Sequence, residues 1–153
     1  IIKNHVKQGM VEAKKLHLPR EVTDIIEQHH GTSLISFFYL KALEKKIENV
    51  EKINFCYNFP KPKTKEAAII MIVDSIEAAS RVLKKTDRKN IEKMVNDVIS
   101  NKSNEGQLQE SPLTLQDIAK IKESIINSLF SMYHNRINYP TESELKRLEE
   151  ENR

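Results

Sequence analysis

The uninterrupted apolar run at residues 67–73 constrains the fold more than any other feature of the sequence. It lies within a helical pattern that spans residues 65–85. Thr64 can cap the start of this helix, and Glu66 suits its positively polarised first turn. A helix that is hydrophobic on all sides has to be buried. We therefore expect residues 65–85 to form a central helix against which the rest of the chain packs.

Apolar residues also recur at helical spacing elsewhere, at residues 1–16, 19–28, 34–47, 87–101 and 114–134. Thr32 and Thr86 stand where two of these helices should begin, and Thr114 forms a capping box with Asp117 before a third. The helix at 34–47 supplies a set of expected core residues: Leu34, Ile35, Phe37, Phe38, Leu40, Ala42, Leu43 and Ile47. Thr141 and Glu144 predict a charged C-terminal helix or tail within residues 141–153.

The remaining segments, 48–63 and 103–112, lose the helical period and predict loops, the second of them on the surface. With 153 residues, three Gly and 31% charged residues, the chain fits a single all-α domain. Its net charge of +3 comes from Lys interspersed with Glu, so no DNA-binding stripe is evident. No apolar run approaches the roughly 20 residues of a membrane span.

Cys56 is the single cysteine, which excludes an internal disulfide and fits a reducing compartment. No local pattern would activate it as a nucleophile. The chain begins at Ile1 without a starting Met, and we expect it to be part of a longer protein.

His29 and His30 are adjacent and precede Gly31. Neighbouring side chains diverge on a regular helix or strand, but they can converge where a helix ends. Gly31 tolerates the left-handed conformation that ends a helix. We therefore expect both imidazoles at a corner between two helices, where they could bind a metal ion. The alternative is a surface dipeptide without a role.

Asp74 and His5 are further candidate ligands. Asp74 follows the apolar run directly, where a carboxylate is costly unless a cation or a metal ion pairs with it. The alternatives are a salt bridge to Arg81 or a Lys, or a position at the solvent edge. His5 lies beside the apolar stripe of residues 1–16, where a lone histidine is usually partly exposed or an ordinary core residue.

The loop before the central helix carries aromatic and basic residues together. Tyr57 and Phe59 lie beside Lys61, Lys63 and Lys65, a combination that suits a ligand with phosphates and a flat base. The loop could also be a simple connection.

Three motifs resemble HD-domain phosphohydrolases. They are His29-His30-Gly31-Thr32-Ser33-Leu34, the block Pro60-Lys61-Pro62-Lys63-Thr64-Lys65-Glu66-Ala67-Ala68, and the block at residues 73–81 that contains Asp74. More narrowly, residues 1–140 are similar to the cytoplasmic HD domain of membrane-anchored, seven-transmembrane cyclic di-AMP phosphodiesterases. The resemblance implies an all-α HD-type helical bundle, truncated at its N-terminus, in the cytoplasm beside the inner membrane and capable of forming a homodimer.

The same resemblance implies two transition-metal ions, iron or manganese, and cleavage of cyclic di-AMP to the linear 5′-phosphorylated dinucleotide. By motif, His5, His29 and His30 would bind one metal ion and Asp74 the other. From the composition of the loop, we expect Tyr57, Lys61, Lys63 and Lys65 to bind this substrate, with Lys63 or Lys65 holding phosphate oxygens.

The chain departs from the family pattern at two points. It contains no His-Asp dipeptide, so the pair that names the family should lie before Ile1. It also has Tyr57-Asn58-Phe59-Pro60 where a glycine is expected near Phe59. Two other functions stay open: a non-catalytic helical module that binds a nucleotide or a protein, and an HD hydrolase that acts on another nucleotide.

Overall fold

The chain is all-helical in the computed structural model, which describes residues 2–134, 147 and 151, so the predicted fold class is confirmed. The α-helices are α1 (Asn4–Lys15), α2 (Arg20–Gln28), α3 (Ser36–Glu44), α4 (Lys65–Ser80), α5 (Arg88–Asn104) and α6 (Leu115–His134). A short 3-10 helix, η1 (Lys52–Phe55), precedes α4. Among these described residues, no helix combines the length and the apolar character that crossing a membrane requires.

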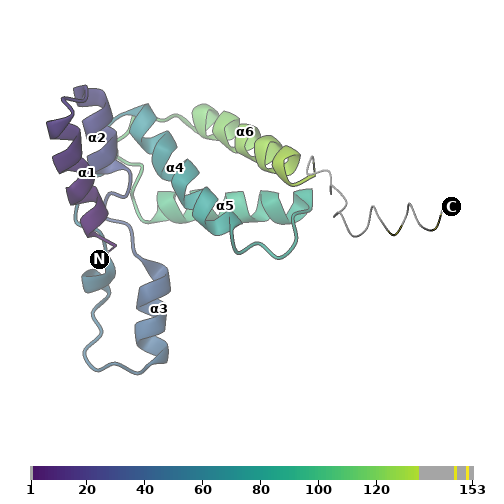
Figure 1. Cartoon of the computed structure of the whole chain (residues 1–153), viewed down its shortest axis with the longest axis horizontal. Coiled ribbons are helices and arrows are strands. Elements are labelled where there is room, and N and C mark those ends of the chain that lie inside the picture. The colour runs from purple at the N-terminus through teal and green to yellow at the C-terminus, as the bar shows by residue number, and fades with distance from the viewer. Residues whose placement is uncertain (1, 135–146, 148–150, 152–153) are drawn as a thin grey trace.

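The helices form two packed groups and an arm (Figure 1). Helices α1 and α2 pack together at one end, and α4, α5 and α6 pack together beside them. Contacts between α2 and α4 join the two groups. Helix α3 and η1 pack on each other and extend away from both groups.

The main core lies between α4, α5 and α6. Its buried members are Ala68, Met71, Ile72, Ile76, Ile91, Val95, Ile99, Leu108 and Ile126. The predicted apolar faces of the helices at 87–101 and 114–134 supply this core, as expected from their helical spacing.

The central helix is shorter and less deeply buried than predicted. It ends at Ser80 rather than at residue 85. Within the apolar run, Met71 and Ile72 are fully buried, but Ile70 and Val73 remain about two-fifths exposed, at 42% and 41%. The prediction of burial on all sides was therefore wrong, because α5 and α6 cover one part of α4 and leave another part open.

The residues of the segment 34–47 that we expected in the core are mostly exposed, so this prediction was wrong. Ala42 is buried, whereas Phe37 is 64% exposed, and Leu40, Leu43 and Ile47 are also exposed. Leu34 pairs with Cys56 in an isolated antiparallel bridge ahead of the helix. The physical reason is the position of α3 on the arm, where its substantial packing partner is the short helix η1.

Two predicted caps are wrong, and only one of them is replaced by another capping side chain. Helix α3 begins at Ser36, after Ile35, so Thr32 does not cap it. The Asp87 carboxylate accepts the backbone N–H of Asn90 at 3.0 Å and caps α5 in place of Thr86. In both cases the threonine lies within a few residues of the start of the helix but is not its N-cap residue.

The caps predicted at Thr64 and Thr114 are confirmed. Thr64 Oγ1 accepts the backbone N–H of Ala67 at 3.1 Å. Thr114 Oγ1 accepts the backbone N–H of Asp117 at 3.1 Å, and Asp117 accepts the backbone N–H of Thr114 at 3.0 Å. This reciprocal pair is a capping box with Asp in the place of Glu.

The segment 103–112 is packed more tightly than a surface loop. Helix α5 continues to Asn104, and the chain then turns through Gly106 with φ +66°. Gln107 and Leu108 are buried. The predicted helix with Thr141 and Glu144 lies outside the described residues.

Candidate metal centre

The His29-His30 pair lies at a sharp corner after α2, as predicted. Helix α2 ends at Gln28, and Gly31 adopts φ +51°. The two imidazole rings are 4.0 Å apart between centroids and are tilted by 40°. The end of the helix therefore brings two adjacent side chains together, which a regular helix would not do.

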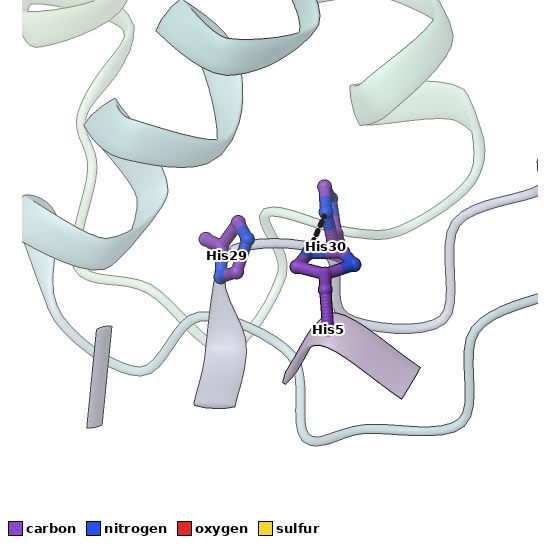
Figure 2. Close-up of side chains that lie close together, drawn as sticks. All are labelled: His5, His29 and His30. Atoms are coloured by element: carbon purple, nitrogen blue, oxygen red, sulfur yellow. Dashed lines mark hydrogen bonds between the residues drawn. The ribbon is translucent and has the colours of Figure 1, made fainter. Parts of the chain in front are cut away.

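His5 of α1 completes a cluster of three histidines (Figure 2). One ring nitrogen from each of His5, His29 and His30 lies within 4.8 Å of the others. The Nε2 atoms of His5 and His30 are 3.0 Å apart. Packing of α1 against α2 positions His5, because His5 is the neighbour of Val6, which is fully buried.

The other ring nitrogens of two histidines face backbone carbonyls. His29 Nδ1 lies 2.9 Å from the carbonyl oxygen of Ile26, and His5 Nδ1 lies 2.5 Å from that of Ile2. A carbonyl can only accept, so Nδ1 carries the proton in each ring and Nε2 keeps its lone pair. Such a bond fixes the tautomer and the ring orientation of metal-binding histidines.

His30 is a sheltered member of the cluster, with 17% of its side chain exposed. The ring of Tyr57 stacks on it at 4.2 Å with an interplanar angle of 17°. Burial, and then the charges of His29, His5 and Lys102, lower the pKa of His30 from 6.5 to about 3. Its imidazole is therefore neutral at physiological pH, which is the form that binds metal ions.

Asp74 lies beside this cluster but at the solvent edge. Its side chain is 49% exposed, and its Oδ2 atom is 3.7 Å from Nδ1 of His30. This distance is too long for a good hydrogen bond. Exposure relieves part of the desolvation cost expected for this carboxylate. Of the two alternatives, a salt bridge to Arg81 or a Lys and a position at the solvent edge, the structure shows the second.

The predicted substrate-binding residues fall into different surroundings. Tyr57 is buried against His30, and burial followed by the charge of Asp74 raises its pKa. Lys61 is partly buried, whereas Lys63 is exposed. Lys65 forms an ion pair of 2.7 Å with Asp117, so its charge is already partnered.

The loop at residues 57–63 is bonded through its backbone to residues 28–33, the turn around His29 and His30 that we call the histidine corner. Tyr57 N–H donates to the carbonyl oxygen of Ser33 at 2.9 Å, and Phe59 N–H donates to that of Gly31 at 3.2 Å. Lys63 N–H donates to Oε1 of the buried Gln28 at 2.9 Å. The loop is therefore more than a simple connection between helices.

Two residues that sequence reasoning missed hold the corner from the side of α5. Gln107 is 2% exposed; its Oε1 accepts the Thr32 N–H at 3.0 Å, and its Nε2 donates to the Thr32 hydroxyl at 2.9 Å. Lys102 Nζ donates to the hydroxyl of the buried Ser33 at 2.7 Å. No local pattern marks either residue, because each acts on a segment about 70 residues away in the sequence.

The donor set of the cluster fits a transition-metal ion. Three imidazoles that converge at one point are typical ligands of zinc, iron, manganese, cobalt or nickel rather than calcium. The separation of 3.0 Å between two Nε2 atoms is close to what two neighbouring ligands, each about 2.1 Å from one ion, would have.

The chain is similar to two curated cyclic-di-AMP phosphodiesterases named PgpH. It is 43% identical over 140 residues to the protein of Bacillus subtilis (strain 168) and 39% identical over 144 residues to that of Listeria monocytogenes. These matches cover 92% and 94% of the chain but 20% of each relative. No protein-family model matches the chain.

A solved structure has a similar fold. The crystal structure of the L. monocytogenes phosphodiesterase PgpH HD domain in complex with cyclic di-AMP has a TM-score of 0.80 and 37% identity to the chain. The match covers 86% of the chain and 61% of the solved one. These comparisons confirm the resemblance on which the sequence expectations rested.

Proposed function

Because the chain is homologous to the HD domain of the cyclic-di-AMP phosphodiesterase PgpH, we propose that it acts in the metal-dependent hydrolysis of cyclic di-AMP. The product would be the linear 5′-phosphorylated dinucleotide. The observation that supports this proposal is the convergence of His5, His29 and His30 at one point of a fold similar to that domain.

In this proposal, the three histidines bind one divalent ion through ring nitrogens, with iron or manganese as the candidates. Asp74, whose Oδ2 lies 3.7 Å from Nδ1 of His30, would bind a second ion next to the first. A metal ion at such a site supplies Lewis acidity and lowers the pKa of a coordinated water. The three histidines and Asp74 would hold the ions, and Tyr57 orients His30 by stacking on its ring.

The chain spans about a fifth of the length of its curated relatives, so the properties of the whole protein are also proposals. We propose a location in the cytoplasm, within a protein that other segments anchor to the inner membrane. A homodimer is the proposed assembly. The ligands of the second metal ion besides Asp74 would come from a His-Asp pair that this chain does not contain.

Elemental analysis of protein purified without chelators tests the metal site. We expect about one transition-metal ion per chain in the wild type and near none in His29→Ala. His134→Ala is the matched control, because His134 lies at the end of α6 and bonds the carbonyl oxygen of Phe130 instead. Equal metal content in His29→Ala and in the wild type would contradict the site.

Hydrolysis of cyclic di-AMP in the presence of manganese is measured on a chain extended upstream to include the His-Asp pair, and the PgpH HD domain of L. monocytogenes serves as the positive control. We expect the linear dinucleotide as the product, and we expect a chelator to abolish its formation. Hydrolysis that persists in the chelator would overturn the metal-dependent function. Competition with other cyclic and linear nucleotides would reveal a different substrate.

A further inference from the structure

Lys102 is a sheltered lysine without an acidic partner at close range. It lies near the end of α5 and is partly buried, and its Nζ donates to Ser33 Oγ at 2.7 Å. None of the ion pairs among the described residues includes it. An ammonium group has three N–H donors, so the bond to Ser33 leaves two of them available.

A cation in such surroundings is stabilised when an anion accompanies it, because removing a charge from water is costly. Burial lowers the pKa of Lys102, and the more distant charges of Glu105 and Asp74 act in the opposite direction. Neither carboxylate is within ion-pair distance of Nζ. The local structure thus has a place for a negative charge that the described side chains do not fill.

This place borders the histidine cluster. Ser33, the partner of Lys102, donates its backbone N–H to the carbonyl oxygen of His30 at 3.0 Å. Lys102 is also near enough to His30 for its charge to lower the pKa of that imidazole.

Lys102 also lines a groove of about 560 Å³ between α3, α4 and α5. Ser75, which follows Asp74 in the sequence, lies on the wall of the same groove, as do the side chains of Phe37 and Asn101. Asp74 itself does not line the groove, whereas Glu105 does. The groove therefore passes Lys102 and reaches the helix that carries Asp74, and its volume is in the range of small-molecule sites.

We propose that Lys102 binds a phosphate of the substrate at the edge of the metal centre, an inference that rests on the proposed phosphodiester substrate. The lysines selected from the sequence are placed less well for this role. Lys65 is neutralised by Asp117 at 2.7 Å, whereas Lys63 is exposed. Two N–H donors of Lys102 would bond phosphate oxygens while the third keeps the bond to Ser33.

The test compares Lys102→Met with Lys102→Arg and with the control Lys93→Met, since Lys93 is an exposed lysine of the same helix α5. Each manganese-loaded protein is titrated by calorimetry with cyclic di-AMP and, separately, with inorganic phosphate. Manganese affinity is measured by competition with a chelator. We expect Lys102→Met to bind both anions at least about tenfold more weakly, since a hydrogen bond to a charged group contributes that much. Lys102→Arg should regain part of this affinity, and Lys93→Met should match the wild type.

The manganese affinity separates anion binding from a merely structural role. In Lys102→Met it should change less than twofold, because the lysine binds the anion and not the metal ion. If manganese affinity and anion affinity fell together, the inference would be overturned. Lys102 would then have a structural role, holding residues 29–33 in place through its bond to Ser33. Unchanged anion affinity in Lys102→Met, or no anion binding by the wild type, would overturn it as well.

Should Lys102→Met fail to fold by circular dichroism, Lys102→Gln replaces it, since an amide can keep the bond to Ser33 without the charge. Failure of the proposed function is recognised separately. If the wild type hydrolyses no cyclic di-AMP while Lys102→Met still weakens phosphate binding, the hydrolytic function fails and the phosphate site stands.

Discussion

At the scale of single residues, the candidate metal centre depends on the conformation of Gly31. Its φ of +51° turns the chain so that both imidazoles face His5. A Cβ atom at this position would lie 2.6 Å from Oε1 of Gln107 and 3.1 Å from Cε of Met71. Glycine is therefore needed here for two reasons, the backbone conformation and the close approach of buried side chains.

We predict that Gly31→Ala lowers the free energy of unfolding by more than 2 kcal/mol and abolishes metal binding. The positive φ alone costs about 1–2 kcal/mol, and the clash with Gln107 adds to it. The measurement is urea unfolding together with elemental analysis. Gly106→Ala is the control: its φ is +66°, but a Cβ there would meet the side chain of the exposed Gln109. It should cost about 1–2 kcal/mol and leave the metal content intact. Equal effects of the two variants would contradict this account.

Asp117 connects stability to pH. The hydrogen bond from Lys65, followed by the bonds from Thr114, lowers the pKa of Asp117 below its ordinary value of 3.8. Because the folded state favours the ionised carboxylate, its contribution is complete above about pH 4. The contribution is lost as the pH falls toward the lowered pKa.

We therefore predict that Asp117→Asn lowers the melting temperature at pH 7 and that the difference from the wild type shrinks below pH 4. Thermal unfolding followed by circular dichroism between pH 7 and pH 2.5 measures this. A difference that stays constant over this range would show that the charge of Asp117 contributes nothing.

At the scale of the helices, capping decides where each element begins. Thr64, at the start of α4, bonds the N–H of Ala67, whereas Thr86 stands one residue before the actual cap of α5, Asp87. Both threonines look alike in the sequence, because each precedes a helical pattern. Only the backbone conformation of the following residues distinguishes them.

We predict that Thr64→Ala lowers the free energy of unfolding by about 1 kcal/mol, the usual contribution of an N-cap. Thr86→Ala is its control and should change stability by less than about 0.5 kcal/mol. Chemical denaturation of both variants provides the comparison. A larger loss in Thr86→Ala than in Thr64→Ala would contradict the assignment of the caps.

Much of the helical pattern was predictable from the sequence because it depends on local spacing. The corner at His29 and His30 was also predictable, since Gly31 marks the end of a helix. The exposure of Phe37 was not predictable, because apolar spacing in the helix after the corner shows a potential core face but not the partner that would cover it. Lys102 was missed for a related reason: its contact with Ser33 joins residues 69 positions apart.

At the scale of the whole molecule, the candidate centre lies between the two packed groups of helices. His5 comes from α1, His29 and His30 follow α2, and Asp74 belongs to α4. Contacts between α2 and α4 hold these elements together. Binding of a metal ion would therefore stabilise the junction between the groups as well as the three side chains.

The loop at residues 57–63 adds a consequence for hydrogen–deuterium exchange. The amide hydrogens of Tyr57, Phe59 and Lys63 all bond to groups of the histidine corner, so each can exchange with solvent only when the corner opens. If opening releases the metal ion, a concentration one hundred times the dissociation constant should slow these amides by about a hundredfold. Leu83, whose N–H bonds the carbonyl oxygen of Ser80 beyond the other end of α4, should keep its rate. Exchange that slows equally at Leu83 would contradict a coupling confined to the loop. If only the loop amides slow, their exchange rates measure how much of the protein has bound metal.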